Sequence, residues 1–253
     1  MACRVFERDY VCKKYSFQTI EVPIRLRHDV IIDALLQCID SPFWLVDHDC
    51  YVFNKNLITI DVINKNENHC GISYYGFKSK YDGQSLPHTF LLSFNPKYLR
   101  TLMHEFNVSS KVYYWKDIPK AICAFLEKRG GIQLGSYPQD GHAYFDTLRL
   151  LSVIAKLDGS GFQILDTPDE DSVFHAGNCS RPEWLLMEDH YHALGAYFWK
   201  SCLNKFPDLM THPAYSSKSK NLPELDEMEA ILNGRGKKES VEQIKYIIKK
   251  ILK

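Results

Sequence analysis

The segment Ile63–Ser73, INKNENHCGIS, lies between two apolar runs and concentrates Asn, Lys and Gly within a few residues. In the preceding run, NLITIDVIN, Ile58, Ile60 and Val62 alternate with polar residues, which is typical of a strand with one buried face. The following run, CGISYYGF, is rich in β-branched and aromatic residues. Because Asn and Gly readily adopt the backbone conformations of a tight reversal, the segment predicts the connection of a β-hairpin.

Asn, Asp and Gly residues also separate short apolar segments along the rest of the chain. Short apolar segments between these residues predict strands at 43–53, 56–64, 70–77, 88–94, 112–115, 132–137, 148–157 and 162–165. Successive short strands with brief connections favour an antiparallel meander.

Helices are predicted at both ends of the chain and between the strands. Apolar residues at three- and four-residue spacing, together with Pro, Gly and a capping box at 180–183, place helices at 28–40, 118–130, 181–206, 224–233 and 240–252. The buried stripe of the longest helix is expected at Met187, Tyr191, Leu194, Phe198 and Cys202. The chain is therefore organised as a helical N-terminal arm (1–42), a β-rich core with the long helix (43–206), and a charged helical tail (215–253).

Composition limits the classes of partner. The 253 residues carry 31 basic and 31 acidic side chains, so no overall field attracts nucleic acid or a membrane, and self-association is weakly opposed. The start of the chain lacks the apolar region of a signal peptide, and no run approaches a membrane span, which predicts a soluble protein. Eight Cys without a CxxC pair indicate reduced thiols rather than zinc ligands or disulfides.

Candidate catalytic chemistry is sparse. Glu188 and His192, four residues apart, would share one face of a helix and are the best metal-ligand pair, although no third ligand accompanies them. Asp47-His48-Asp49 cannot converge within one strand, and Gly159-Ser160-Gly161 precedes no helix start of the phosphate-binding kind. These patterns predict no catalytic and no metal-binding residue. A nucleotide- or metal-dependent enzyme using Glu188 and His192, and a binding module whose terminal helices dock a partner, remain the alternatives.

Several short motifs, taken in order, resemble the cypovirus polyhedrins, which form intracellular crystals around insect virus particles. The family-like positions are Ile63, Asn64, Lys65, Asn66, Gly71, Ile72, Ser73, Pro96, Arg100, Thr101, Tyr144 and Phe145. The strand at 90–94 and the aromatic helix around Tyr197-Phe198-Trp199 also resemble the family. The first 40 residues and the tail after 215 show no such match.

The resemblance implies an α+β fold, with an antiparallel β-sandwich core flanked by helices. It also implies homotrimers packed in a lattice in the host cell cytoplasm, as occlusion bodies that embed and protect virions. No cofactor is required, although nucleotides such as ATP or GTP are expected within the lattice. The expected assembly contacts in the two terminal regions are Phe6, Tyr10, Tyr15, Tyr246 and Ile248.

The aromatic and basic composition suggests how such a lattice would dissolve in the alkaline insect gut. Tyr, Lys and Cys have ordinary pKa values of about 10, 10.4 and 8.5. Above pH ~10.5 a nearly neutral chain with 15 Tyr and eight Cys therefore becomes strongly anionic. Repulsion across dry contacts, where screening is weak, then disfavours the assembly.

Overall fold

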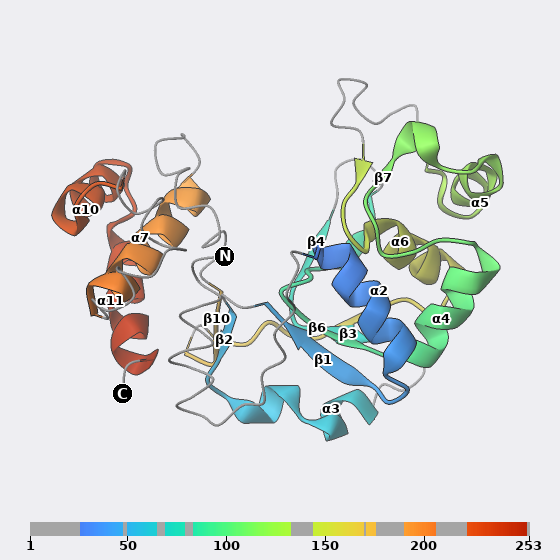
Figure 1. Ribbon diagram of the computed structural model, residues 1–253, viewed down its shortest axis with the longest axis horizontal. Coiled ribbons are helices and arrows are strands. Elements are labelled where there is room, and N and C mark those ends of the chain that lie inside the picture. The colour runs from blue at the N-terminus through green and yellow to red at the C-terminus, as the bar shows by residue number, and fades with distance from the viewer. Residues whose placement is uncertain are drawn as a thin grey trace. The chain divides into compact units, whose positions relative to one another are not determined.

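A four-stranded mixed sheet with the strand order β1–β6–β3–β9 organises one part of the computed structural model (Figure 1). The structure describes residues 26–47, 50–64, 69–78, 83–132, 144–169, 171–175, 190–205 and 222–251. These residues divide into two units. The sheet unit contains the described residues within 26–47 and 54–169, and the helical unit contains those within 50–53 and 171–251.

The elements of the sheet unit are short. Its helices are α2 (His28–Cys38), η2 (Lys55–Ile58), α3 (Ile60–Asn64), α4 (Pro96–Glu105), η3 (Trp115–Asp117), α5 (Lys120–Gly130) and α6 (Arg149–Asp158). Its strands are β1 (Phe43–Val46), β3 (Ile72–Ser73), β4 (Gly76–Lys78), β5 (Ser85–Pro87), β6 (Leu91–Phe94), β7 (Tyr113–Tyr114), β8 (Tyr144–Phe145) and β9 (Gln163–Ile164). Strands β4 and β5 form one two-stranded sheet, and β7 and β8 form another.

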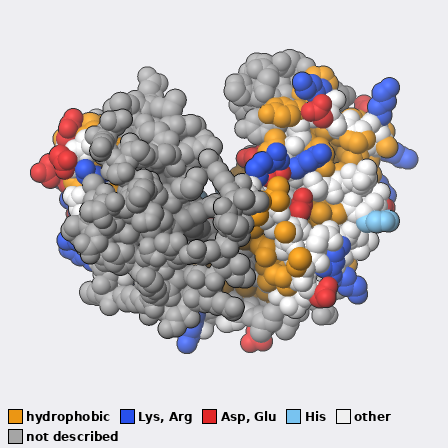
Figure 2. All heavy atoms as spheres, viewed as in Figure 1, with side chains coloured by type: hydrophobic (Ala, Val, Ile, Leu, Met, Phe, Trp, Pro, Cys, Tyr) orange, Lys and Arg blue, Asp and Glu red, His pale blue; other side chains and the backbone are white. Residues whose placement is uncertain are grey.

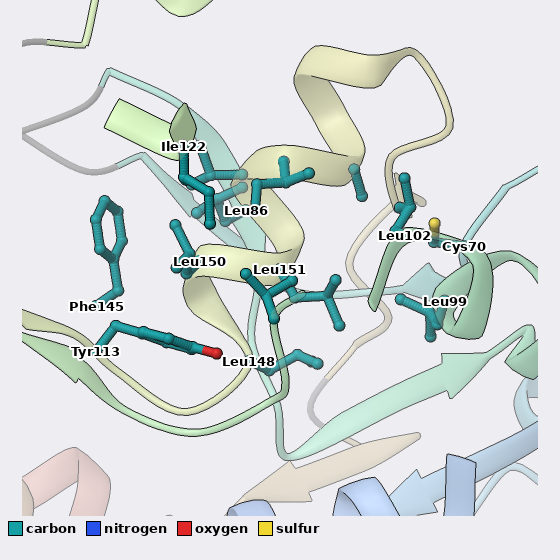
Figure 3. Close-up of a cluster of buried hydrophobic side chains, with 14 of the residues drawn as sticks. Cys70, Leu86, Leu99, Leu102, Tyr113, Ile122, Phe145, Leu148, Leu150 and Leu151 are labelled. Carbon is teal, nitrogen blue, oxygen red and sulfur yellow. The ribbon is translucent and has the colours of Figure 1, made fainter. Parts of the chain in front are cut away.

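One face of the four-stranded sheet packs against helices. Antiparallel pairing aligns Phe43 with Phe94 and Leu45 with Leu92, so these four side chains share a face. Leu92 and Phe94 belong to a buried cluster with side chains of α2, α4, α5 and α6, part of which is shown in Figure 3, and the partly buried Phe43 and Leu45 pack against it. This cluster is the main hydrophobic core of the sheet unit.

The opposite face is covered by the segment around η2. Trp44 stacks on Tyr74 with ring centroids 5.9 Å apart. The Trp44 indole N–H donates to the Thr59 carbonyl at 3.4 Å, and the Tyr74 hydroxyl donates to the Leu57 carbonyl at 2.8 Å. Figure 1 shows α3 on the other side of β1 from α2 and α4.

The predicted hairpin around INKNENHCGIS is wrong. Residues 55–58 and 60–64 are helical, and β3 pairs with β6 and β9 rather than with a preceding strand. The Asn54 side chain accepts the Asn56 N–H at 3.1 Å and so starts a 3₁₀ turn where the strand was expected. The contacts of this segment with Trp44 and Tyr74 then use its backbone carbonyls.

Further strand predictions also need correction. The run at 148–157 forms α6, in which six consecutive residues, Leu150–Ala155, are buried. Arg149, Ser152 and Lys156 recur at the three- and four-residue spacing of a helix, but the apolar run between them, which includes Val and Ile, resembles a buried strand. The meander is also wrong, because β3 and β9 run parallel. The predicted strand at 43–53 is divided between β1 and β2, which belong to different sheets.

Other predictions are confirmed. Helices occur at α2 and α5 in the sheet unit, and strands occur close to the predicted positions at β6, β7 and β9, while the single strand predicted at 70–77 is divided between β3 and β4, which belong to different sheets. The chain contains both helices and strands, as an α+β class requires. Helix α4 was not predicted. It begins at Pro96, because proline is tolerated in the first turn of a helix, and it buries Leu99 and Leu102. The predicted strand at 132–137 lies outside the described residues beyond Ile132.

The helical unit contains α7 (His190–Lys205), α10 (Leu225–Gly234), α11 (Lys238–Ile251) and the paired strands β2 (Cys50–Val52) and β10 (Val173–His175). The tail helices confirm the prediction for both segments. Phe198 and Cys202 are buried in α7 as predicted, whereas Leu194 is partly buried. Residues 176–189, which include the predicted helix start and Met187, lie outside the described residues. Tyr191 lies in α7, but its side chain is outside the description.

Ion pairs join the helices of this unit. The Lys245 ammonium lies 2.5 Å from a Glu229 carboxylate oxygen and 2.9 Å from one of Glu242. Lys200, which is buried, reaches the exposed Glu224 carboxylate at 3.3 Å.

Among the described residues, no helix is long and apolar enough to cross a membrane.

Gly71 marks the tightest packing in the sheet. A Cβ atom at this position would collide with the Ser93 carbonyl oxygen and with the Phe162 ring. The Gly71 carbonyl also accepts the Gln163 N–H at 3.0 Å, which aligns β9 beside β3. Any side chain at residue 71 would therefore push β3 away from β6.

Replacing Gly71 by Ala should lower the free energy of unfolding by about 3 kcal/mol, because backbone rather than a flexible side chain must move. Urea unfolding followed by circular dichroism measures this change. Gly234→Ala is the control, since a Cβ there meets nothing within 4 Å. Equal stability of the Gly71→Ala and wild-type proteins would contradict the packing described.

Candidate functional site

A pocket of about 340 Å³ opens in the sheet unit. Its lining comes from α2, the β4–β5 pair, the segment after β5, and the turn that begins α6. The lining residues are His28, Phe77, Leu86, Pro87, His88, Thr89, Asp146, Thr147, Leu148, Arg149 and Ser152. Segments far apart in the sequence thus bring three nitrogen-bearing side chains, those of His28, His88 and Arg149, to one pocket.

The floor of the pocket is apolar and the rim is polar. Leu86 and Leu148 are 2% and 1% exposed, and Pro87 is also buried. His28, His88 and Asp146 are exposed. A ligand entering this pocket would meet hydrocarbon at its inner end and hydrogen-bonding groups at the opening.

The turn before α6 is fixed by its own hydrogen bonds. Leu148 has a left-handed backbone conformation, with φ of 66°, which is costly for a residue other than Gly. Its N–H donates to the Ser110 carbonyl at 2.6 Å, and the Asp146 Oδ1 accepts the Thr147 N–H at 2.7 Å. These bonds and the burial of Leu148 place Arg149 at the pocket.

Aromatic rings form one wall. The Arg149 guanidinium lies over the Phe77 ring at 4.7 Å from its centroid, and Phe77 contacts His88 at a centroid distance of 4.8 Å. Beyond the residues that line the pocket, ring contacts continue from His88 to Phe90 at 5.6 Å and from Phe90 to Tyr75 at 4.7 Å. At the rim, His28 Nε2 lies 3.7 Å from the Asp47 carboxylate. The Arg149 guanidinium therefore places a positive charge against the Phe77 ring at one end of this wall.

Cys70, from the INKNENHCGIS segment, is buried beneath the sheet rather than in the pocket. Burial raises the pKa of its thiol to about 12, and the nearby Asp158 charge also raises it, against the opposing effect of the Ser160 hydroxyl. The Sγ–Oγ distance to Ser160 is 3.8 Å, and the adjacent His69 Nδ1 lies 3.2 Å from the Gly161 carbonyl. A thiol that stays protonated is a poor nucleophile, so this Cys-His neighbourhood does not form a thiolate site.

The family-like positions have structural roles wherever the structure describes them. Ile63, Ile72 and Phe145 are buried apolar residues, and Ser73 donates from its hydroxyl to the Tyr75 and Leu91 carbonyls. Asn64 ends α3, Tyr144 pairs with Tyr114 across β8 and β7, and the Thr101 hydroxyl donates to the Lys97 carbonyl. Lys65 and Asn66 lie outside the described residues.

Arg100 has the most specific of these roles. Its guanidinium donates to the Leu36 carbonyl at 2.8 Å and to the Ile39 carbonyl at 3.2 Å, and it pairs with Asp40 at 2.9 Å. Leu36 belongs to the last turn of α2. Arg100 therefore satisfies carbonyl groups at the end of that helix and joins α4 to α2.

The remaining predicted residues do not form a site within the described part of the chain. Glu188, Phe6, Tyr10 and Tyr15 lie outside it, and His192 lies in α7 with its side chain outside the description. Tyr246 is 52% exposed. Ile248, in contrast, is 5% exposed and packs inside the helical unit, so it offers no surface for a contact with another copy.

Sequence reasoning missed the pocket residues His28, His88 and Arg149. No local motif marks them, because each belongs to a different element and their proximity depends on the fold. Within the described residues, no group of three His, Cys, Asp or Glu side chains could hold a metal ion. The lining brings apolar, cationic and hydrogen-bonding groups together in one pocket.

Comparison with known proteins gives no relative: no family model, no curated protein and no solved structure matches the chain.

Removing the Cys70 thiol should flatten the loss of stability at alkaline pH. Because the pKa of this group is about 9 when exposed and about 12 in the folded chain, the unfolded state releases its proton first. Stability is thus full below pH ~9 and falls by roughly 1.4 kcal/mol per pH unit up to pH ~12. Urea unfolding of Cys70→Ala at pH 8, 9, 10 and 11 should show a shallower decline than the wild type.

Cys38→Ala is the matched control, since Cys38 is exposed on α2. Parallel declines of stability with pH for the wild type and Cys70→Ala would show that folding does not raise the pKa of the Cys70 thiol.

Proposed function

We propose that this chain is a viral occlusion-body matrix protein, a structural protein without catalytic activity. In this proposal it forms homotrimers that pack into crystals in the host cell cytoplasm, embed virions, and dissolve at alkaline pH in the insect gut. ATP or GTP held between copies belongs to the same proposal.

The observation that carries the proposal is the shared order of the family-like motifs. A shared order is what a shared fold predicts when the matching residues hold that fold together. Gly71 lies against β6, Ser73 bonds the Leu91 carbonyl, and Arg100 bonds the end of α2, so three of the motif positions stabilise the sheet unit.

The proposal includes a β-sandwich core, and edge strands offer a route to contacts between copies. Strands β1 and β9 are the two edges of the described four-stranded sheet. Each carries an apolar side chain that is 36% exposed, Val46 on β1 and Ile164 on β9. Because an edge strand can pair with a strand of another chain, strands from a second copy would extend the sheet.

The surface composition also favours contact between copies. Tyr114 and Tyr246 are 46% and 52% exposed, and Tyr is enriched in protein interfaces. The space-filling view in Figure 2 shows hydrophobic side chains interspersed with charged ones over the described surface. With a formal net charge of zero, little long-range repulsion opposes such contacts.

Expression of the full chain in insect cells should produce polyhedral bodies that are visible by light microscopy and diffract X-rays. Diffuse protein at high expression would contradict the proposal. Tyr246→Ala should reduce the number of cells with crystals, whereas Lys249→Ala, an exposed neighbour on α11, should not. Equal crystal counts for Tyr246→Ala and wild type would remove Tyr246 from the lattice contacts.

Dissolution should precede unfolding when the pH is raised. Burial raises the pKa values of Tyr74 and Tyr197, and hydrogen bonds with Glu229 and Glu242 raise that of Lys245. The stability from these groups is complete below their unfolded pKa values of about 10, begins to decline above them, and is fully lost only when pH has passed the higher folded values. Crystals should therefore dissolve near pH ~10.5 into protein that keeps its helical circular dichroism signal.

Simultaneous loss of turbidity and of the helical signal would contradict this order of events. Dissolution already at pH 7 would contradict the alkaline release itself.

A further inference from the structure

We infer that the pocket of the sheet unit binds a small molecule that carries an oxyanion group on a flat apolar body. This inference concerns a site within one chain and does not depend on the proposed assembly.

The floor fits the apolar body. Leu86, Pro87 and Leu148 are buried at the pocket, and the Phe77 ring stands at its side. A volume of about 340 Å³ lies at the lower end of the range for ligand sites, which corresponds to a compact ligand with about one ring. Flat groups stack well against a Phe or His ring, and here Phe77 and His88 lie 4.8 Å apart in one wall.

The rim fits the oxyanion. Arg149 carries a permanent positive charge, and its contact with Phe77 limits the orientations of its planar N–H groups. His28 and His88 add ring nitrogens, and Thr89 and Thr147 add hydroxyl groups that can donate to an oxygen. Planar guanidinium groups match carboxylate and phosphate oxygens in pairs.

The acidic groups near the pocket do not reverse this preference. Among the described lining residues Asp146 carries the carboxylate, and its Oδ1 already accepts the Thr147 N–H at 2.7 Å. Asp47 lies 3.7 Å from His28 and is not part of the lining. A cationic ligand would meet the positive charge of Arg149 at the rim, and a neutral apolar ligand would make no use of that charge.

Four probes separate the parts of the ligand. Phenyl phosphate and benzoate carry a ring and an oxyanion, benzyl alcohol keeps the ring without the charge, and inorganic phosphate keeps the charge without the ring. Isothermal titration calorimetry of the full chain at pH 7 should show one saturable site for phenyl phosphate or benzoate. Binding of benzyl alcohol and of inorganic phosphate should be at least about tenfold weaker, because each lacks one set of contacts.

Variants locate the site. Arg149→Met keeps a long side chain beside Phe77 but removes the charge, and it should weaken phenyl phosphate or benzoate binding about tenfold. Arg129→Met, on the exposed face of α5, is the control for a change in net charge and should leave binding unchanged. Thermal unfolding of both variants, followed by circular dichroism, checks that the fold is retained.

Tighter binding of phenyl phosphate identifies a phosphate ester as the natural group, and tighter binding of benzoate identifies a carboxylate. Three results would overturn the inference: no saturable heat with either ring-bearing anion, equal binding of inorganic phosphate or benzyl alcohol, or equal weakening by Arg149→Met and Arg129→Met. If Arg149→Met unfolds, the comparison of the four probes on the wild type still decides the ligand class.

Discussion

The close approach of the Gly71 backbone to the Ser93 carbonyl is the constraint on which the sheet unit depends. It allows β3 to lie between β6 and β9, and it leaves no space for a side chain at residue 71. The strand β6 that results carries Leu92 and Phe94 into the helix-packed core on one face. Helices α2, α4, α5 and α6 then bury this face, and the turn before α6 is positioned where the pocket opens.

Sequence patterns identified the elements whose signals are local. Helices α2, α5, α10 and α11 have apolar stripes, and Gly or Pro marks their ends, so they were predictable. Helix α6 was mistaken for a strand because the run Leu150–Ala155 is short and rich in Leu, Val and Ile, although the polar residues Arg149, Ser152 and Lys156 have helical spacing. The helical turn at 55–58 was missed because alternation of Ile and polar residues fits both a strand and a segment held by Trp44 and Tyr74. The pocket could not be predicted, since His28, His88 and Arg149 meet only in the folded chain.

The chain uses its polar residues mainly to position backbone. Arg100 binds carbonyl groups of α2, Ser73 binds the Leu91 carbonyl, and Ser110 joins the Asp33 side chain to the loop before β7. Because these residues bond to the backbone, short motifs without catalytic side chains can still be characteristic of a fold. The lining of the pocket differs in this respect, because its cation and its two imidazoles are placed where a ligand can reach them.

Strands β1 and β2 are neighbours in the sequence, yet β1 belongs to the sheet unit and β2 pairs with β10 in the helical unit. During synthesis, β2 leaves the ribosome long before β10, α7, α10 and α11 exist. Because synthesis proceeds from the N-terminus, the sheet unit can fold first, before the strand that pairs with β2 has been made. The helical unit closes only when the last helix has been released, so a truncated product would expose the apolar faces of both β2 and α7 to other chains.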